Sequence, residues 1–263
     1  MKIINSGRVL LLSDLHQDIF YAEKALENNF DHVVFMGDYF DTLKKIDNEK
    51  IYGMEAMCKW LSDKYIELGD RATWLIGNHD VSYLAGRKLR DQTHRLKNFV
   101  CSGYTNKKRC KYSKYINLDW EQSLQLAVQV GKYTISHAGF SPTYMPPINN
   151  DNPIEEGIKN MCNEWNKVRS NFMFGESHWI AMAGYCRGGG SAVGGPTWLD
   201  WNHEFTEIQD INQIVGHTTT PSTEIRIKQS GNSINYCIDN LQQTYAILEN
   251  DKIEIINIEN HPF

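Results

Sequence analysis

The sequence predicts an α/β fold in a single domain spanning residues 1–263, and three observations support this. Short apolar runs of strand length alternate with longer segments of helical spacing in the first third of the chain. With 263 residues, 41% of them hydrophobic, the chain can bury a sizeable core as one large domain or as two small ones, and we favour one. No internal repeat, linker or low-complexity segment divides the sequence.

The first third of the chain is typical of β-α-β units. Strand-like runs lie at residues 8–12, 31–36 and 72–76, and helical spacing lies between them at 18–29 and 48–68. Each strand-like run leads into polar residues, in the segments SDLHQD, GDYFD and GNHD. Ligands of open α/β sheets bind outside the carboxyl ends of the strands, where loops converge and helix N-termini present free N–H groups. The three polar segments are therefore predicted to meet at one site.

The remaining chain is less regular. Residues 101–120 are polar and basic, and we expect an insertion or a loop excursion there. The later elements are expected in this order: two strands around a turn at Gly131-Lys132, a loop rich in proline and asparagine (142–153), a helix (154–172), a glycine-rich loop (186–201), an apolar run ending in Gly-His (211–220), and a C-terminal hairpin turning at Asn250-Asp251.

Composition limits the classes of partner. The formal charge of −5 gives no general attraction to nucleic acid or to anionic lipid, so net charge does not support nucleic-acid binding. The N-terminal apolar run is too short for a signal peptide, and no stretch approaches the roughly 20 apolar residues of a membrane span. Six cysteines without a C-x-x-C pair indicate reduced thiols. We expect a cytoplasmic protein that does not contact a membrane.

Four of the nine histidines directly follow apolar, strand-like runs: His16, His79, His137 and His217. A single histidine in such a place is more often structural, but four of them beside Asp14, Asp38 and Asn78 favour a metal site. Carboxylate, imidazole and amide oxygen suit Mn²⁺, Fe²⁺ or Zn²⁺, and there are too many donors for one ion. Two ions are predicted, with Asp38 as the bridging ligand and a water activated between the ions.

The order of these motifs resembles the calcineurin-like metallophosphoesterase superfamily. Among its members the sequence is most similar to the PPP-type phosphatases and their bacterial and phage relatives, which include the bis-nucleotide tetraphosphatases. The resemblance extends from residue 8 to about residue 248 and is carried by five motifs: D-x-H (Asp14, His16), G-D-x-x-D (Gly37, Asp38, Asp41), G-N-H-D (77–80), S-H-A-G (136–139) and G-H-T (216–218).

The resemblance implies a role for each matching residue. Asp14 and His16 would bind the first metal, Asp38 would bridge, and the second metal would be bound by Asn78, His137 and His217. His79 would donate a proton to the leaving oxygen, and Asp41 would orient its ring. The family fold is a four-layer αββα sandwich of two mixed sheets, and its cofactor is a pair of divalent ions. Mn²⁺ is favoured here, with Fe, Zn or Ni as alternatives.

Two positions depart from the family pattern. Thr42 stands where the G-D-x-x-D-R-G motif has a phosphate-binding arginine, and Gln17 stands where a glycine usually follows D-x-H. Threonine cannot supply the bidentate contacts that a guanidinium makes to phosphate. Arg187 resembles the second phosphate-binding arginine of the PPP enzymes, and we assign it that role.

The expected function is hydrolysis of a phosphate ester without a covalent enzyme intermediate, by a PPP-like phosphomonoesterase such as a serine/threonine phosphatase. Its substrate would be a phosphoprotein or a small phosphorylated compound. The alternative is a nucleotide or RNA-end phosphoesterase, and a more remote one is a non-catalytic scaffold. The basic run at 106–114 is more typical of a solvated surface than of a guide for a phosphorylated polymer. For Trp198 and Trp201, packing is favoured over contact with a base or an aromatic leaving group.

Overall fold

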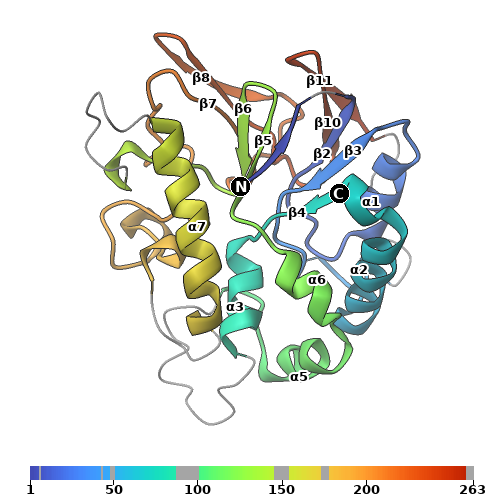
Figure 1. Ribbon diagram of the computed structural model, residues 1–263. Helices are drawn as coiled ribbons and strands as arrows, with labels where there is room; N and C mark the ends of the chain where they lie inside the picture. The colour runs from blue at the N-terminus through green and yellow to red at the C-terminus, as the bar shows by residue number, and fades with distance from the viewer. Residues whose placement is uncertain are drawn as a thin grey trace.

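The computed structural model describes residues 1–5, 7–42, 44–47, 51–86, 101–144, 154–172 and 178–258. Its strands form two mixed sheets stacked face to face, with helices on the outer faces (Figure 1). This is the four-layer α/β sandwich that the sequence predicted. The loop expected at 142–153 lies outside the described residues from position 145 onward.

The first sheet has five strands in the order β11-β10-β2-β3-β4. β2, β3 and β4 are parallel to one another, and β10 and β11 form an antiparallel hairpin that pairs with β2 through β10. That hairpin turns at Asn250 and Asp251, both with positive φ, as the sequence predicted. The strands are β2 (Val9–Leu12), β3 (His32–Phe35), β4 (Ala72–Trp74), β10 (Thr244–Glu249) and β11 (Lys252–Asn257).

The second sheet has six strands in the order β1-β5-β6-β7-β9-β8. β6 lies parallel to β7, and β7 lies parallel to β9, so three loops leave the same edge of this sheet. The predicted turn at Gly131-Lys132 joins β5 to β6. The strands are β1 (Lys2–Ile4), β5 (Ala127–Val130), β6 (Tyr133–Ser136), β7 (Asn212–Val215), β8 (Arg226–Ser230) and β9 (Ser233–Cys237).

Alternation along the strands separates two apolar layers. Val9 and Leu11 of β2 face the second sheet and pack in one cluster with Val128 and Ile135. The alternate residues Leu10 and Leu12 face outward and pack in the cluster that contains the helices. Burying both faces of the sheet explains why β2 is apolar throughout.

The helices are α1 (Ile19–Leu26), α2 (Met54–Leu68), α3 (Asn78–Gly86), α5 (Asn106–Tyr115), α6 (Leu118–Ser123) and α7 (Ile154–Phe172). Short 3-10 turns lie at Gly69–Arg71, Pro142–Tyr144, Trp179–Ala181 and Tyr185–Arg187. No helix among the described residues is long and apolar enough to cross a membrane.

The region at 101–120, where the sequence predicted an insertion or a loop excursion, forms α5 and α6. Thr105 caps α5 by accepting the N–H of Lys108, and Asn117 caps α6 in the same way. α5 packs against α2 and α3, and its residue Tyr112 is buried. The polar composition concealed the buried face of a short helix, so the expectation of a loop excursion was wrong, whereas that of an insertion stays a prediction.

Candidate metal centre

The predicted site residues converge where the strands of both sheets end. Asp14 and His16 follow β2, Asp38 follows β3, and Asn78 and His79 begin α3 after β4. His137 follows β6, and His217 follows β7 in the other sheet. Because both sheets contribute from the same edge, residues up to 203 positions apart come into contact, as in the hydrogen bond from the His217 N–H to Asp14 (3.0 Å).

Several site residues have a left-handed backbone. φ is 44° at His16, 51° at Asp38, 67° at Asp41 and 64° at His217. Residues other than glycine rarely adopt this region, and such strain concentrates at functional sites. The loops are therefore shaped to aim these side chains and not only to connect strands.

Two glycines of the motifs lie so close to a site carboxylate that no larger residue would fit. A Cβ on Gly77 would lie 2.2 Å from Oδ1 of Asp38, and one on Gly216 would lie 2.3 Å from Oδ2 of Asp14. Each glycine therefore lets a backbone segment pass directly against a site carboxylate.

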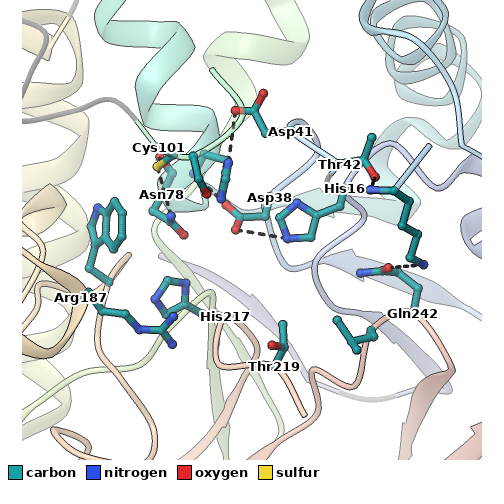
Figure 2. Close-up of a pocket in the computed structure, with 15 residues that line it drawn as sticks. His16, Asp38, Asp41, Thr42, Asn78, Cys101, Arg187, His217, Thr219 and Gln242 are labelled. Atoms are coloured by element: carbon teal, nitrogen blue, oxygen red, sulfur yellow. Dashed lines mark hydrogen bonds and ion pairs between the residues drawn. The ribbon is translucent and has the colours of Figure 1, made fainter. Parts of the chain in front are cut away.

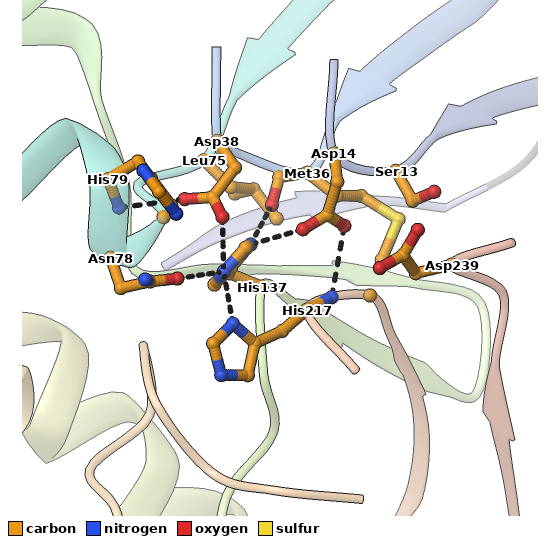
Figure 3. A network of polar contacts seen from close by, with 12 residues as sticks. Ser13, Asp14, Met36, Asp38, Leu75, Asn78, His79, His137, His217 and Asp239 are labelled. Carbon is orange, nitrogen blue, oxygen red and sulfur yellow. Dashed lines mark hydrogen bonds and ion pairs between the residues drawn. The ribbon is translucent and has the colours of Figure 1, made fainter. Parts of the chain in front are cut away.

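One group of donors surrounds Nε2 of His137 (Figure 3). Nδ1 of this ring lies 2.9 Å from the Met36 carbonyl, which can only accept, so Nδ1 carries the proton and Nε2 has a free lone pair. Oδ1 of Asn78 is 3.0 Å from that Nε2, Nδ1 of His217 is 3.2 Å away, and Oδ2 of Asp38 is 3.6 Å away. Such convergence of oxygen and nitrogen donors fits a divalent cation.

A second group shares Asp38. Donor atoms of His16, Asp38 and His79 lie within 4.8 Å of one another, as do those of Asp38, His137 and His217. Nδ1 of His16 faces the Phe40 carbonyl at 3.0 Å, so its Nε2 lone pair is left to face Oδ2 of Asp38 at 3.8 Å. Asp38 therefore belongs to both groups, which is the arrangement expected of a bridging ligand.

Burial keeps the imidazoles neutral. It lowers the pKa of His16 to about 4 and that of His137 to about 3, and it lowers the pKa of His217 well below its ordinary value. Burial also raises the pKa of Asp38, and the neighbouring carboxylate of Asp14 adds to this. Neutral imidazoles and crowded carboxylates together form a site that a cation would stabilise.

Asp14 lies beside these groups but belongs to neither of the two ion-sized clusters found among the described residues. Its Oδ2 accepts the His217 N–H, and its buried Oδ1 has no hydrogen-bond partner there. Its role as a ligand of the first metal remains a prediction. The pKa of Asp14 is raised by burial and by Asp239.

Asp239 is a residue that the sequence reasoning did not assign. It follows β9, is fully buried, and its Oδ2 also has no hydrogen-bond partner in the described part of the chain. Figure 3 shows it beside Asp14. The signal was present in the sequence, because Asp239 follows an apolar strand-like run just as the other site residues do.

His79 and Asp41 lie together as predicted. Nδ1 of His79 is 3.2 Å from Oδ2 of Asp41, and the Asp41 side chain is completely buried. Although burial alone would raise the pKa of Asp41, its hydrogen bond with His79 and other donors outweigh this and lower it. A carboxylate cannot donate, so the proton on this side of the His79 ring is held by Nδ1.

Gln17 and Asp80 hold the loops in place. Oε1 of Gln17 accepts the N–H of Asp41 (3.0 Å), and its amide donates to the Tyr52 carbonyl. The Asp80 carboxylate accepts the N–H groups of Asp38, Tyr39 and Gly77 at 2.8–3.0 Å. The departure from the family pattern at Gln17 therefore has a structural reason. Asp80, the last residue of the GNHD segment, fixes the loop that carries Asp38.

A cavity of about 300 Å³ opens over the donor groups (Figure 2). Arg187 lies on one side of it, and Thr42 and Gln242 lie on the other. Trp198 and Lys44 also line the cavity, and Nζ of Lys44 donates to Gln242 at 3.0 Å. Arg187 donates to Asp200 (2.8 Å) and to Thr218 (3.0 Å), while its Nε has no partner among the described residues. Of the predicted site residues, only Asp14 and His137 do not line this cavity.

The family model of the calcineurin-like phosphoesterases matches residues 7–221. This chain belongs to that family. Members are metal-dependent phosphoesterases, so the chain is a hydrolase of phosphate esters whose family uses divalent ions. No curated protein matches the sequence.

Two solved structures share the fold. A cold-active protein-tyrosine phosphatase of a psychrophilic Shewanella species is 16% identical over 97% of this chain and 79% of its own, with a TM-score of 0.56. A protein serine/threonine phosphatase from Saccharomyces cerevisiae with similarity to human phosphatase PP5 is 13% identical over 100% of this chain and 85% of its own, with a TM-score of 0.51.

Proposed function

We propose that this protein is a phosphomonoesterase of the PPP type that uses two divalent ions and acts on a phosphorylated protein or a small phosphorylated compound. The observation that carries the proposal is the sharing of Asp38 between two groups of donor atoms at the floor of one cavity. The similarity in fold to a tyrosine phosphatase and to a serine/threonine phosphatase supports the substrate class.

The donor set fits two ions. His137, His217, Asn78 and Asp38 would hold one of them, and His16 and Asp38 would hold the other. We assign Asp14 to this second ion from the family pattern, although it lies outside the cluster that His16, Asp38 and His79 form. Bound divalent ions supply Lewis-acid charge for the phosphoryl oxygens and lower the pKa of water. Mn²⁺ is our proposed ion because the donors combine imidazole with carboxylate and amide oxygen.

His79 supplies the proton that the leaving oxygen needs. Its Nδ1–H is held by Asp41, which fixes the ring at the wall of the cavity and leaves Nε2 as the nitrogen that we assign to proton transfer. Arg187 lies at the cavity wall with a guanidinium already oriented by Asp200. We assign it to binding the phosphoryl group of the substrate, since a guanidinium matches phosphate oxygens.

A nucleotide phosphoesterase is the second candidate, and Thr42 is the reason. This residue lines the cavity and stands where the PPP pattern has arginine. A terminal phosphate would therefore be bound by one guanidinium group fewer than in that pattern. A substrate with a substituted phosphate would fit such a site more easily.

A substrate panel with Mn²⁺ tests both candidates. It comprises p-nitrophenyl phosphate, bis-p-nitrophenyl phosphate, phosphoserine and phosphotyrosine peptides, and diadenosine tetraphosphate. The main proposal expects the highest kcat/KM on a monoester, and the second expects it on the diester or the dinucleotide. Absence of turnover on every member would contradict both.

We further propose that the protein is located in a reducing compartment, the cytoplasm. All six cysteines are free in the structure, and four of them are buried. Exposed Cys110 and Cys186 would be open to oxidation elsewhere.

A further inference from the structure

The basic run at 106–114 divides into exposed and inward-facing members. Lys107 and Lys114 are exposed, whereas Arg109 is buried and Lys108 points towards the metal centre. Nζ of Lys108 lies 3.0 Å from Oδ1 of Asp41 and 2.7 Å from the Gly103 carbonyl. The solvated surface that the sequence favoured therefore does not describe Lys108.

We propose that Lys108, together with Tyr83, is a positioning residue that fixes Asp41 and through it the ring of His79. Oδ1 of Asp41 accepts hydrogen bonds from Nζ of Lys108 (3.0 Å) and from the hydroxyl of Tyr83 (2.5 Å). Oδ2 is left for Nδ1 of His79. The two oxygens have separate partners, so the carboxylate cannot rotate without breaking contacts on both sides.

The surroundings keep this arrangement rigid. The Asp41 and Tyr83 side chains are buried, and burial next to Asp41 raises the pKa of the Tyr83 hydroxyl, which therefore keeps its proton. Thr105 caps α5 at the N–H of Lys108, which sets where the lysine leaves the helix. A Cβ on Gly103 would lie 3.0 Å from Cβ of Asp41, so this loop packs closely against the carboxylate.

A direct role in binding substrate does not fit the geometry. Lys108 is absent from the lining of the cavity over the metal centre, whereas Asp41 and His79 line it. The Lys108 ammonium group contacts Oδ1 of Asp41 and the Gly103 carbonyl. It acts through Asp41 and not on the reacting atoms.

The inference rests on the proposed acid role of His79, and the test uses leaving groups of different basicity. Lys108→Met removes the cation and retains the length of the side chain, Lys108→Arg retains the charge, and Lys107→Met is the matched control on the same helix. With two ions bound, we expect Lys108→Met to lower kcat roughly tenfold for phenyl phosphate and less than twofold for 2,4-dinitrophenyl phosphate, since the latter needs no acid. KM should change little, and Lys108→Arg and Lys107→Met should resemble the wild type.

Tyr83→Phe should show the same dependence on the leaving group in weaker form. An equal loss of kcat for both substrates, or a loss of metal in Lys108→Met, would overturn the inference. If His79→Asn also lowered kcat equally for both substrates, the proposed acid role of His79 would fail as well. If the loss of kcat depended on the leaving group in His79→Asn but not in Lys108→Met, only the inference about Lys108 would fail.

A second measurement does not depend on turnover. In zinc-loaded protein with ¹⁵N-labelled histidine, the Nδ1–H resonance of His79 can be assigned by its loss in His79→Gln. We expect this resonance to move in Lys108→Met and to stay in place in Lys107→Met. An unchanged resonance in Lys108→Met would mean that the lysine does not hold the pair.

Discussion

At the scale of single residues, the proposal gives His79 and Asp38 different roles although their donor atoms lie in the same group. We expect His79→Asn to retain nearly all bound metal and to reduce kcat by roughly 10²–10⁴ for substrates with poor leaving groups. Asp38→Asn should instead lose metal, because this carboxylate is the member shared by both groups. Metal analysis of the two purified variants beside their kinetics measures the difference. Similar metal loss in both would mean that His79 is a ligand.

Cys101 contacts Asn78, one of the proposed metal ligands. Its buried Sγ accepts the Nδ2–H of Asn78 at 3.2 Å, which leaves Oδ1 of the amide to face His137. Outer contacts of this kind change metal affinity when they are removed. We expect Cys101→Ala to weaken binding of the second ion by about tenfold, and Cys101→Ser to restore most of it. Metal titration followed by calorimetry would measure this, and equal affinities for the wild type and Cys101→Ala would exclude the role.

At the scale of elements, the sequence predicted which residues come together at the strand ends. It did not predict the contacts that their side chains make there. Apolar runs ending in histidine or aspartate could be recognised because strand ends of an α/β sheet gather loops at one edge. The place of Asp14 outside both donor groups, and the turn of Lys108 towards Asp41, depend on loop backbones and on the packing of α5. Such contacts join segments far apart in sequence, and no local pattern specifies them.

The pairing of β3 with β4 buries a histidine far from the metal centre. Nε2 of His32 lies 2.9 Å from the Thr73 hydroxyl, and burial lowers the pKa of His32 to about 4, with Lys2 and Arg71 adding to this. The folded state therefore binds fewer protons than the unfolded state between pH 6.5 and pH 4, so stability falls as the pH drops through this window.

The measurement compares this protein with His32→Gln. We expect the free energy of unfolding of the wild type to decline relative to the variant by about 1–3 kcal/mol between pH 6.5 and pH 4, and to change no further below pH 4. Urea titrations at several pH values give the two curves. Parallel curves across the window would show that His32 titrates normally in the fold.

At the scale of the whole molecule, metal binding and folding should be linked. The donor residues lie in the segments that follow β2, β3, β4, β6 and β7. The site therefore exists only when both sheets are formed and stacked. An ion at 100 times its dissociation constant stabilises the folded state by about 2.7 kcal/mol, which raises the Tm of a chain of this size by roughly 5–10 °C. We expect Mn²⁺ to produce such a rise in chelator-treated protein, measured by calorimetry.

Asp38→Asn provides the contrast, because losing the shared ligand should abolish most of the rise in Tm with Mn²⁺. Its metal-free Tm should equal or exceed that of the wild type, since burial and the neighbouring Asp14 make the Asp38 carboxylate costly without a cation. A wild-type Tm that ignored Mn²⁺ while activity required it would indicate that the ions bind a preformed site too weakly to affect folding. A variant that kept the full rise would show that the two sheets bind metal without Asp38.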